Sequence, residues 1–155
     1  MECDLDLGGD GEPIGDYEVR LGVSYEALSC TECSRPIQPG VEHEIVTGDL
    51  DDDTCEFHTC MDCVHIAEGL QTNGRDHGML WDQLEEYGGE DGGGGFEHFN
   101  SGCLARVKTA SAKTYVRERY LKWKRLYGPD PLQKQEGAVE KSQSEQAAKP
   151  GEAKP

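Results

Sequence analysis

Hydrophobic and polar residues alternate in the stretch DYEVRLGV, between Tyr17 and Val23. A period of two is typical of a β-strand with one buried face, so we predict a half-buried strand here. Two further β-rich stretches follow, VEHEIVTG and TCEFHTC, and the turn-forming residues DLDDD separate them. Together they predict a β-hairpin with its tip near residues 48–53.

Helical periodicity follows the hairpin. MDCVHIAEGL and MLWDQLEEYG each predict a short helix. The longest pattern covers residues 104–127, with Ser101 as a capping residue before it and Gly128, followed by prolines, after it. One long amphipathic helix over 101–128 is therefore expected.

These elements divide the chain into five segments. They are an irregular acidic N-terminus (1–15), a folded region (16–87), a Gly-rich linker (88–100), a basic amphipathic helix (101–128) and a tail that we expect to be disordered (129–155). Hydrophobic residues make up only 35% of the chain, which excludes one large core over its whole length. A folded region this small usually needs a bound metal or a covalent cross-link.

Two C-x-x-C motifs supply the candidate cross-link, CTEC at 30–33 and CMDC at 60–63. Two such pairs can surround one tetrahedral ion with four thiolates. The first pair precedes a Pro- and Gly-rich turn and the hairpin, and the second opens a helix, whose N-terminus favours thiolates. This order predicts an α+β fold, a small treble-clef zinc finger with one structural Zn²⁺. Its ligands are Cys30, Cys33, Cys60 and Cys63.

Other uses of the cysteines are weaker predictions. Iron–sulfur or dithiol redox chemistry would need the same thiolates, but redox C-x-x-C motifs usually follow a strand in a βαβ unit, which this pattern lacks. His58 is an alternative ligand to one cysteine. A disulfide framework is not expected, because seven cysteines are an odd number. A second metal site would have to come from the remaining cysteines and histidines, which are Cys3, Cys55, Cys103, His43, His65, His77 and His98. Of these, Cys55 and Cys103 are expected simply to be buried.

Charge is distributed very unevenly. Residues 1–103 carry 25 acidic and 3 basic side chains, whereas residues 104–127 carry 8 basic side chains and 1 acidic one. The acidic body should be repelled by phosphate backbones, which the basic helix could bind. The N-terminal stretch has no apolar run and no window approaches a membrane span, so we expect a cytoplasmic protein, in a compartment where structural disulfides are rare.

The run C-x-x-C-x-x-P-I-x-x-G at 30–40, continued by H-T-C-x-x-C at 58–63, resembles a group of small zinc-finger proteins encoded by bacteriophages and prophages. CDLD near the N-terminus and the Trp-containing MLWDQLEEYG extend the resemblance over about residues 1–87. It implies a zinc finger, a phage-like origin and hence a host cytoplasm, but no activity, because the group has none assigned. LIM and RING fingers, which are protein-interaction modules, are more distantly similar and need a second zinc site.

HNH nucleases also use a treble-clef frame, with a His base on the hairpin and a catalytic ion bound from the helix. Glu56 and His58 could imitate the base, and Asn73 with His77 the ion site. The last two residues lie in a Gly-rich loop beyond the helix, so we do not expect an enzyme.

The favoured function is a non-catalytic protein-interaction module. Its acidic hairpin tip would face a basic partner, such as a host or defence protein with a basic nucleic-acid groove, which it would inhibit or modulate. The carboxylates concerned are Asp49, Asp51, Asp52 and Asp53. The alternative is a nucleic-acid-binding or transcription-regulating zinc-finger protein that acts through the basic helix over 104–127, with Arg117 and Lys124 among its cations. Self-association through the apolar stripe of that helix is a further prediction.

Overall fold

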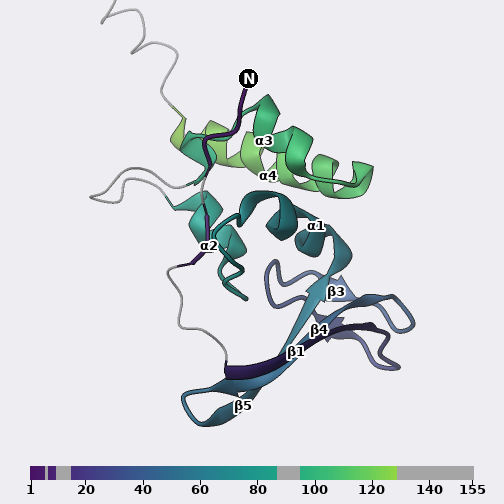
Figure 1. Cartoon of the computed structure of the whole chain (residues 1–155). Helices are drawn as coiled ribbons and strands as arrows, with labels where there is room; N and C mark the ends of the chain where they lie inside the picture. The colour runs from purple at the N-terminus through teal and green to yellow at the C-terminus, as the bar shows by residue number, and fades with distance from the viewer. Residues whose placement is uncertain (6, 10–14, 87–94, 129–155) are drawn as a thin grey trace, which may run out of the picture.

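The computed structural model describes residues 1–5, 7–9, 15–86 and 95–128. It has mixed α+β architecture in three layers, with a small antiparallel sheet at one end and two layers of helices above it (Figure 1). The predicted tail over 129–155 and the glycine run over 88–94 lie outside the described residues.

The sheet contains three strands in the order β1-β4-β5, and a two-residue ladder joins β2 to β3. Their bounds are β1 Gly15–Gly22, β2 Leu28–Ser29, β3 Pro36–Ile37, β4 His43–Leu50 and β5 Asp53–Cys60. The helices are α1 Met61–Leu70, α2 Leu80–Glu85, the 3₁₀ turn η1 Gly95–Glu97, α3 Ser101–Arg106 and α4 Ala110–Tyr127. None of the helices among the described residues has the length and apolar character that a bilayer span requires.

The predicted hairpin is confirmed. Strands β4 and β5 pair in register along their whole length, so only Asp51 and Asp52 remain to form the turn. Both have positive φ, 51° and 65°, as a two-residue type I′ turn requires, and Asp tolerates this conformation better than most residues. The tight turn holds a group of carboxylates at the far end of the sheet.

The predicted N-terminal strand is present as β1, but the prediction that one face is buried is wrong. Because α1 continues directly from β5, the helices contact β5 and β4, and β1 is left at the outer edge. All four apolar residues of this stretch are exposed for about half of their surface: Tyr17 59%, Val19 49%, Leu21 54% and Val23 52%.

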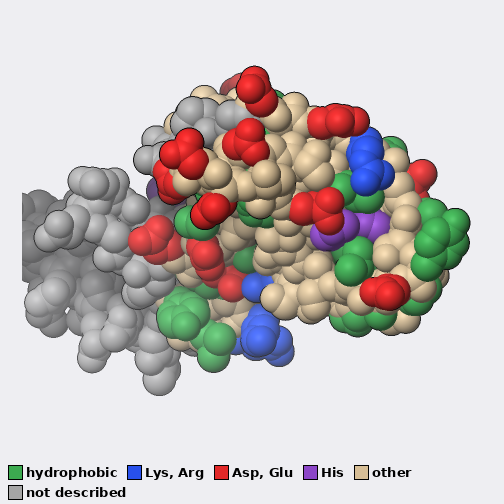
Figure 2. Space-filling view, turned by 90° about the horizontal axis from the view of Figure 1, so that it is seen from below, with side chains coloured by type: hydrophobic (Ala, Val, Ile, Leu, Met, Phe, Trp, Pro, Cys, Tyr) green, Lys and Arg blue, Asp and Glu red, His purple; other side chains and the backbone are tan. Residues whose placement is uncertain are grey.

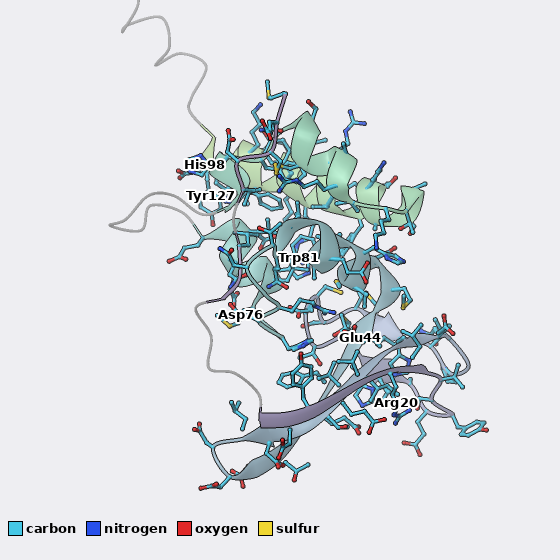
Figure 3. All side chains as sticks on the ribbon, viewed as in Figure 1. Arg20, Glu44, Asp76, Trp81, His98 and Tyr127 are labelled. Atoms are coloured by element: carbon cyan, nitrogen blue, oxygen red, sulfur yellow. A yellow bond between two sulfur atoms is a disulfide. The ribbon has the colours of Figure 1, made fainter. Side chains whose placement is uncertain are left out.

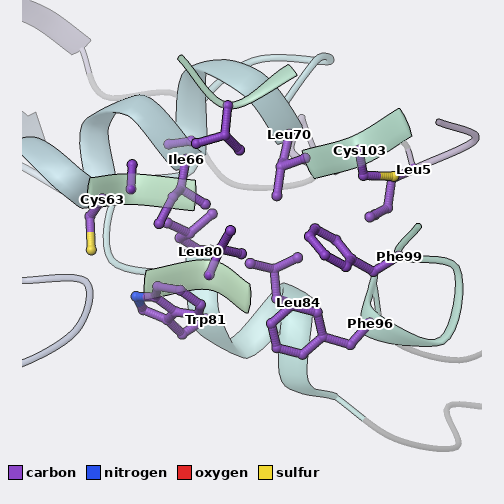
Figure 4. Packing of buried hydrophobic residues seen from close by; sticks show 14 of the residues in the cluster. Leu5, Cys63, Ile66, Leu70, Leu80, Trp81, Leu84, Phe96, Phe99 and Cys103 are labelled. Carbon is purple, nitrogen blue, oxygen red and sulfur yellow. The ribbon is translucent and has the colours of Figure 1, made fainter. Parts of the chain in front are cut away.

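The core lies among the helices rather than within the sheet (Figure 4). Ile66 and Leu70 of α1 and Leu80 and Leu84 of α2 are completely buried. The predicted linker also contributes to this core at its C-terminal end, because Phe96 is only 1% exposed and its ring lies against those of its neighbours. Those neighbours are Trp81, Phe99, Tyr120 and Trp123. Residues 95–100 are therefore packed structure and not a spacer.

The single helix predicted over 101–128 is in fact two helices, α3 and α4. Thr109 adopts an extended conformation between them and caps α4, since its Oγ1 accepts from Ala112 N at 3.2 Å. Helix α3 begins one residue earlier than the predicted cap implies, because Asn100 and not Ser101 accepts from the first free N–H groups. A Cβ on Gly69 of α1 would lie 2.9 Å from the backbone where α3 ends, so α1 and α3 meet backbone to backbone.

A disulfide between Cys3 and Cys103 corrects the expectation that no cysteine pair would be oxidised. The N-terminal residues lie alongside α3 (Figure 1), and both cysteines are buried. Two side chains of the α3 region hold this segment: Arg106 Nη2 donates to Cys3 O at 2.9 Å, and Asn100 Nδ2 donates to Glu2 O at 3.0 Å. The covalent bond therefore joins segments that are 100 residues apart in the sequence.

Candidate metal centre

The four cysteines of the two C-x-x-C motifs come together where the sheet meets α1. Cys30 and Cys33 lie in the turn between β2 and β3, Cys60 ends β5, and Cys63 is in the first turn of α1. Their Sγ atoms all lie within 4.8 Å of one another, and the Cys33 and Cys60 sulfurs are 3.9 Å apart. A tetrahedral ion with Zn–S bonds of about 2.3 Å needs sulfurs about 3.8 Å apart. The cluster is therefore compatible with one ion of the size of zinc.

Backbone hydrogen bonds shape the turn that carries the first pair. Cys30 N donates to Arg35 O and Ser34 N donates to Cys30 O, both at 2.9 Å. Ser34 takes a left-handed conformation with φ of 60°, which closes the turn. Thr31 N donates to His58 O at 2.7 Å, and this bond fixes the turn against β5. The sulfurs are thus presented by rigid backbone on both sides of the cluster.

Four thiols in this space cannot all ionise without a cation. The Cys33 thiol shares hydrogen bonds with the other three sulfurs, and the bond with Cys30 has the largest effect. These bonds hold the pKa of Cys33 below its usual range. Hydrogen bonds with Cys30 and Cys33 in turn raise the pKa of the Cys60 and Cys63 thiols. A bound divalent cation would allow all four to act as thiolates, the form that coordinates metal.

Arg35 covers the less buried side of the cluster. Its Nε donates to Cys33 Sγ and its Nη2 to Cys60 Sγ, both at 3.5 Å, and Nη2 also donates to Asp62 Oδ2 at 3.0 Å. The Arg35 guanidinium carbon lies over the Tyr115 ring of α4, 3.5 Å from its centroid. Since a zinc tetrathiolate carries two excess negative charges, this cation offsets part of that charge and connects the site to α4.

Replacing Arg35 by Gln should weaken zinc binding about tenfold to a hundredfold, because two coordinating sulfurs lose their charged donor. Competition with a chromogenic chelator measures the affinity. Arg125→Gln is the matched control: it removes the same charge from an exposed position in the last turn of α4 and should leave the affinity unchanged. Equal affinities in the wild type and in the Arg35→Gln variant would contradict the role given to this side chain.

Two acidic residues near the cluster have internal structural roles that sequence reasoning missed. Glu32 is only 8% exposed, and its two carboxylate oxygens accept from Gly78 N and Leu80 N at 2.8 and 2.9 Å. Burial raises the pKa of this carboxyl. Glu44 points from β4 toward the helices (Figure 3) and receives Arg75 Nη1 on both oxygens at 2.8 Å. These bonds fix the cysteine turn and the sheet to the loop that leads into α2.

His58 does not take the place of a cysteine ligand. Its Nδ1 lies 3.0 Å from Nε2 of the buried His43, and its Nε2 lies 2.7 Å from Glu56 Oε1. The pair that could imitate a nuclease base is therefore engaged within the sheet. His77, the other candidate, packs its ring 5.6 Å from that of Phe57.

The remaining cysteines are not brought together as ligands. Cys3 and Cys103 form the disulfide, and Cys55 Sγ donates to Gly48 O at 3.2 Å. Within residues 1–5, 7–9, 15–86 and 95–128, the four cysteines are the one set of three or more His, Cys, Asp or Glu side chains placed to share an ion.

The acidic tip, defined as Asp49, Asp51, Asp52 and Asp53, is exposed. Figure 2 views the sheet end of the molecule, where carboxylates are spread widely and cations are few. Residues 1–103 contain 3 basic side chains. Arg35 and Arg75 are paired with Asp62 and Glu44, which leaves Arg20 as the cation of this part that no described ion pair includes.

The basic residues of α4 are arranged differently. Arg117 and Lys124 are exposed, as are Lys122 and Arg125. The aromatic residues predicted to accompany them are engaged in the core: Trp123 is 7% exposed and Tyr115 lies edge-on to Trp81 at 5.3 Å. Tyr127, the last residue of α4, is 48% exposed, so within the described residues the helix presents its cations with one clearly exposed aromatic side chain on which a base could stack.

The chain was also compared with protein-family models, with curated proteins and with solved structures, and none of the three comparisons gives a match.

Proposed function

We propose that this chain is a small treble-clef zinc-finger protein that acts by binding another protein and not by catalysis. The cysteine turn, the β4–β5 hairpin and the second cysteine pair at the start of α1 follow one another in the order that such a finger requires. The resemblance of residues 30–63 to phage-encoded fingers supports the same assignment. One structural Zn²⁺ would be held by the four cysteines and would stabilise the surface that does the binding.

The observation that carries the proposal is the acidic tip. Its carboxylates stand on a tight turn at the end of a two-stranded hairpin, away from the cations of α4. A rigid group of like charges has little ordering entropy to lose on binding, and its field extends about 8 Å at physiological ionic strength. Such a surface fits Arg/Lys clusters on a partner.

We infer that the partner is a nucleic-acid-handling protein with a basic groove, which the acidic surface occupies in place of a phosphate backbone. Two features support this kind of partner. The sheet end would repel nucleic acid itself, because few cations balance its carboxylates. A phage-encoded chain would use such a surface to inhibit a host or defence protein.

Replacing Asp51, Asp52 and Asp53 together by Asn should reduce capture of basic proteins from a bacterial lysate about tenfold or more. Asn tolerates the left-handed turn, so the hairpin is preserved. Quantitative mass spectrometry of the captured proteins measures the loss, and the proteins retained by the wild type should be released by duplex DNA.

The matched control neutralises three exposed carboxylates on the helical part of the molecule, Asp4, Glu97 and Glu118, by Asn or Gln. It has the same net charge as the tip variant and should capture as much of the basic proteins as the wild type does. Equal loss in both variants would show that total charge and not the tip is responsible, and no loss in either would sink the proposal.

A second candidate function is nucleic-acid binding through α4, which the exposed cations Arg117 and Lys124 favour. Fluorescence anisotropy with a labelled duplex separates the two functions. Binding that falls in an Arg117→Gln/Lys124→Gln variant and persists in the tip variant would support this candidate against the first.

A further inference from the structure

Strand β1 is an open edge of the sheet. In the described part of the chain it pairs with β4 on one side and with no strand on the other. In an antiparallel strand, alternate residues direct their N–H and C=O groups to opposite sides, so part of the β1 backbone has unpaired donors and acceptors at this edge. Val19 and Leu21 remain 49% and 54% exposed beside them. Edge backbone and apolar side chains together form a surface suited to another strand.

The sequence of β1 is complementary to itself in one register. Reading Tyr17-Glu18-Val19-Arg20-Leu21 against its own reverse places Glu18 opposite Arg20 twice, Tyr17 opposite Leu21 twice, and Val19 opposite itself. The charged pairs would share one face of the joined sheets and the apolar residues the other. Arg20 lies on this outer strand in Figure 3. Glu18 and Arg20 are both exposed, and no ion pair within the described residues includes either one.

Other registers do not have this complementarity. Residues directly opposite in antiparallel strands have their side chains on the same face of the sheet. A two-fold axis normal to the sheet must therefore place one residue opposite its own copy, and cannot place it opposite its sequence neighbour. An axis at Glu18 would place Glu18 opposite Glu18, and one at Arg20 would place Arg20 opposite Arg20. Within β1, only the axis at Val19 brings opposite charges together without also placing like charges opposite each other. On the N-terminal side, the register shift between Gly15 and Glu18, with Asp16 at φ of 38°, ends the regular ladder.

We propose that β1 pairs antiparallel with β1 of a second copy of this chain, around a two-fold axis through Val19, and joins the two sheets into one. The contact is isologous, so each copy contributes the same residues and the assembly closes as a dimer. The strand contact is short, and a strongly acidic chain repels its copy. The dimer is therefore weak, concentration-dependent and favoured by added salt.

The test is sedimentation equilibrium of the full zinc-loaded chain over a range of concentrations, on the wild type and on charge-reversed variants. Glu18→Arg and Arg20→Glu each convert both symmetric charge pairs into like-charge pairs, and each should weaken self-association at least about tenfold. The double variant Glu18→Arg/Arg20→Glu restores opposite charges and should associate within about twofold of the wild type. A mixture of the two single variants should form a heterodimer that neither forms alone.

Circular dichroism and zinc content verify that each variant is folded. A monomeric wild type up to about 1 mM would overturn the proposal. So would a dimer that both single reversals leave unchanged, because that result would place the contact elsewhere. Leu126→Gln tests the main competing surface, since Leu126 is 66% exposed on α4. The proposal requires this variant to dimerise as the wild type does.

Discussion

Removing the proposed zinc from the four-cysteine cluster should abolish cooperative unfolding of the chain. Structural zinc in small fingers contributes roughly 10–16 kcal/mol of apparent binding free energy, whereas the whole stability of a domain is about 5–15 kcal/mol. Cys30 and Cys63 are buried and come from the cysteine turn and α1, so loss of the ion would remove the coordination that joins these two elements. Thermal denaturation with and without a strong chelator, followed by circular dichroism, measures the effect.

Elemental analysis makes this prediction specific to the cluster. The wild type should contain about one zinc per chain, and Cys30→Ser and Cys63→Ser should each lose both the metal and the cooperative transition. Cys55→Ser is the matched control, because Cys55 bonds to Gly48 O and not to the cluster, and it should keep the metal. Two zinc ions per chain, or iron with visible absorbance, would contradict a single structural zinc.

Replacing both Cys3 and Cys103 by Ser should lower the free energy of unfolding by about 2–5 kcal/mol. The bond closes a loop of 100 residues, and long loops gain most from closure because the unfolded chain loses more conformations. Without the bond, Arg106 and Asn100 would hold the N-terminal segment only by hydrogen bonds. Urea denaturation measures the loss, and the zinc content should not change, since the disulfide is separate from the cluster.

Thiol titration of the denatured wild type checks the bond itself. Five thiols should react before reduction, and all seven cysteines after it. Cys55→Ser again serves as the control, since it removes a thiol without removing a cross-link. Seven reactive thiols in the protein purified without reductant would contradict the disulfide and restore the expectation drawn from a reducing compartment.

Local patterns predicted the elements that are decided locally. The hairpin, α1 and the four-cysteine cluster depend on turn residues and short spacings, which are visible in the sequence. The Cys3–Cys103 bond could not be predicted, because nothing in the sequence brings residues 100 positions apart together. The break between α3 and α4 does have a local signal, because Thr109 is a residue type that commonly caps a helix N-terminus.

Burial was harder to predict than secondary structure. The alternation around Val19 correctly indicated a strand but not its position at the edge of the sheet, because periodicity does not tell which strands the helices will cover. Similarly, Glu32 reads as one more surface charge, yet it is buried because two backbone N–H groups converge on it from a distant loop. Such roles arise from tertiary contacts between segments far apart in the sequence.

The cysteine cluster, which spans 30–63, lies inside the disulfide loop from Cys3 to Cys103. Helix α4 begins at Ala110, beyond both. Among the described helices it alone lies outside the disulfide loop, and it is held by the packing of Ala112, Val116 and Trp123 and by the bonds that Arg119 and Trp123 donate to Glu85 of α2. The most positively charged element is therefore attached to the acidic remainder through noncovalent contacts and the connecting chain, so its attachment depends on the core and on Glu85 and not on the disulfide.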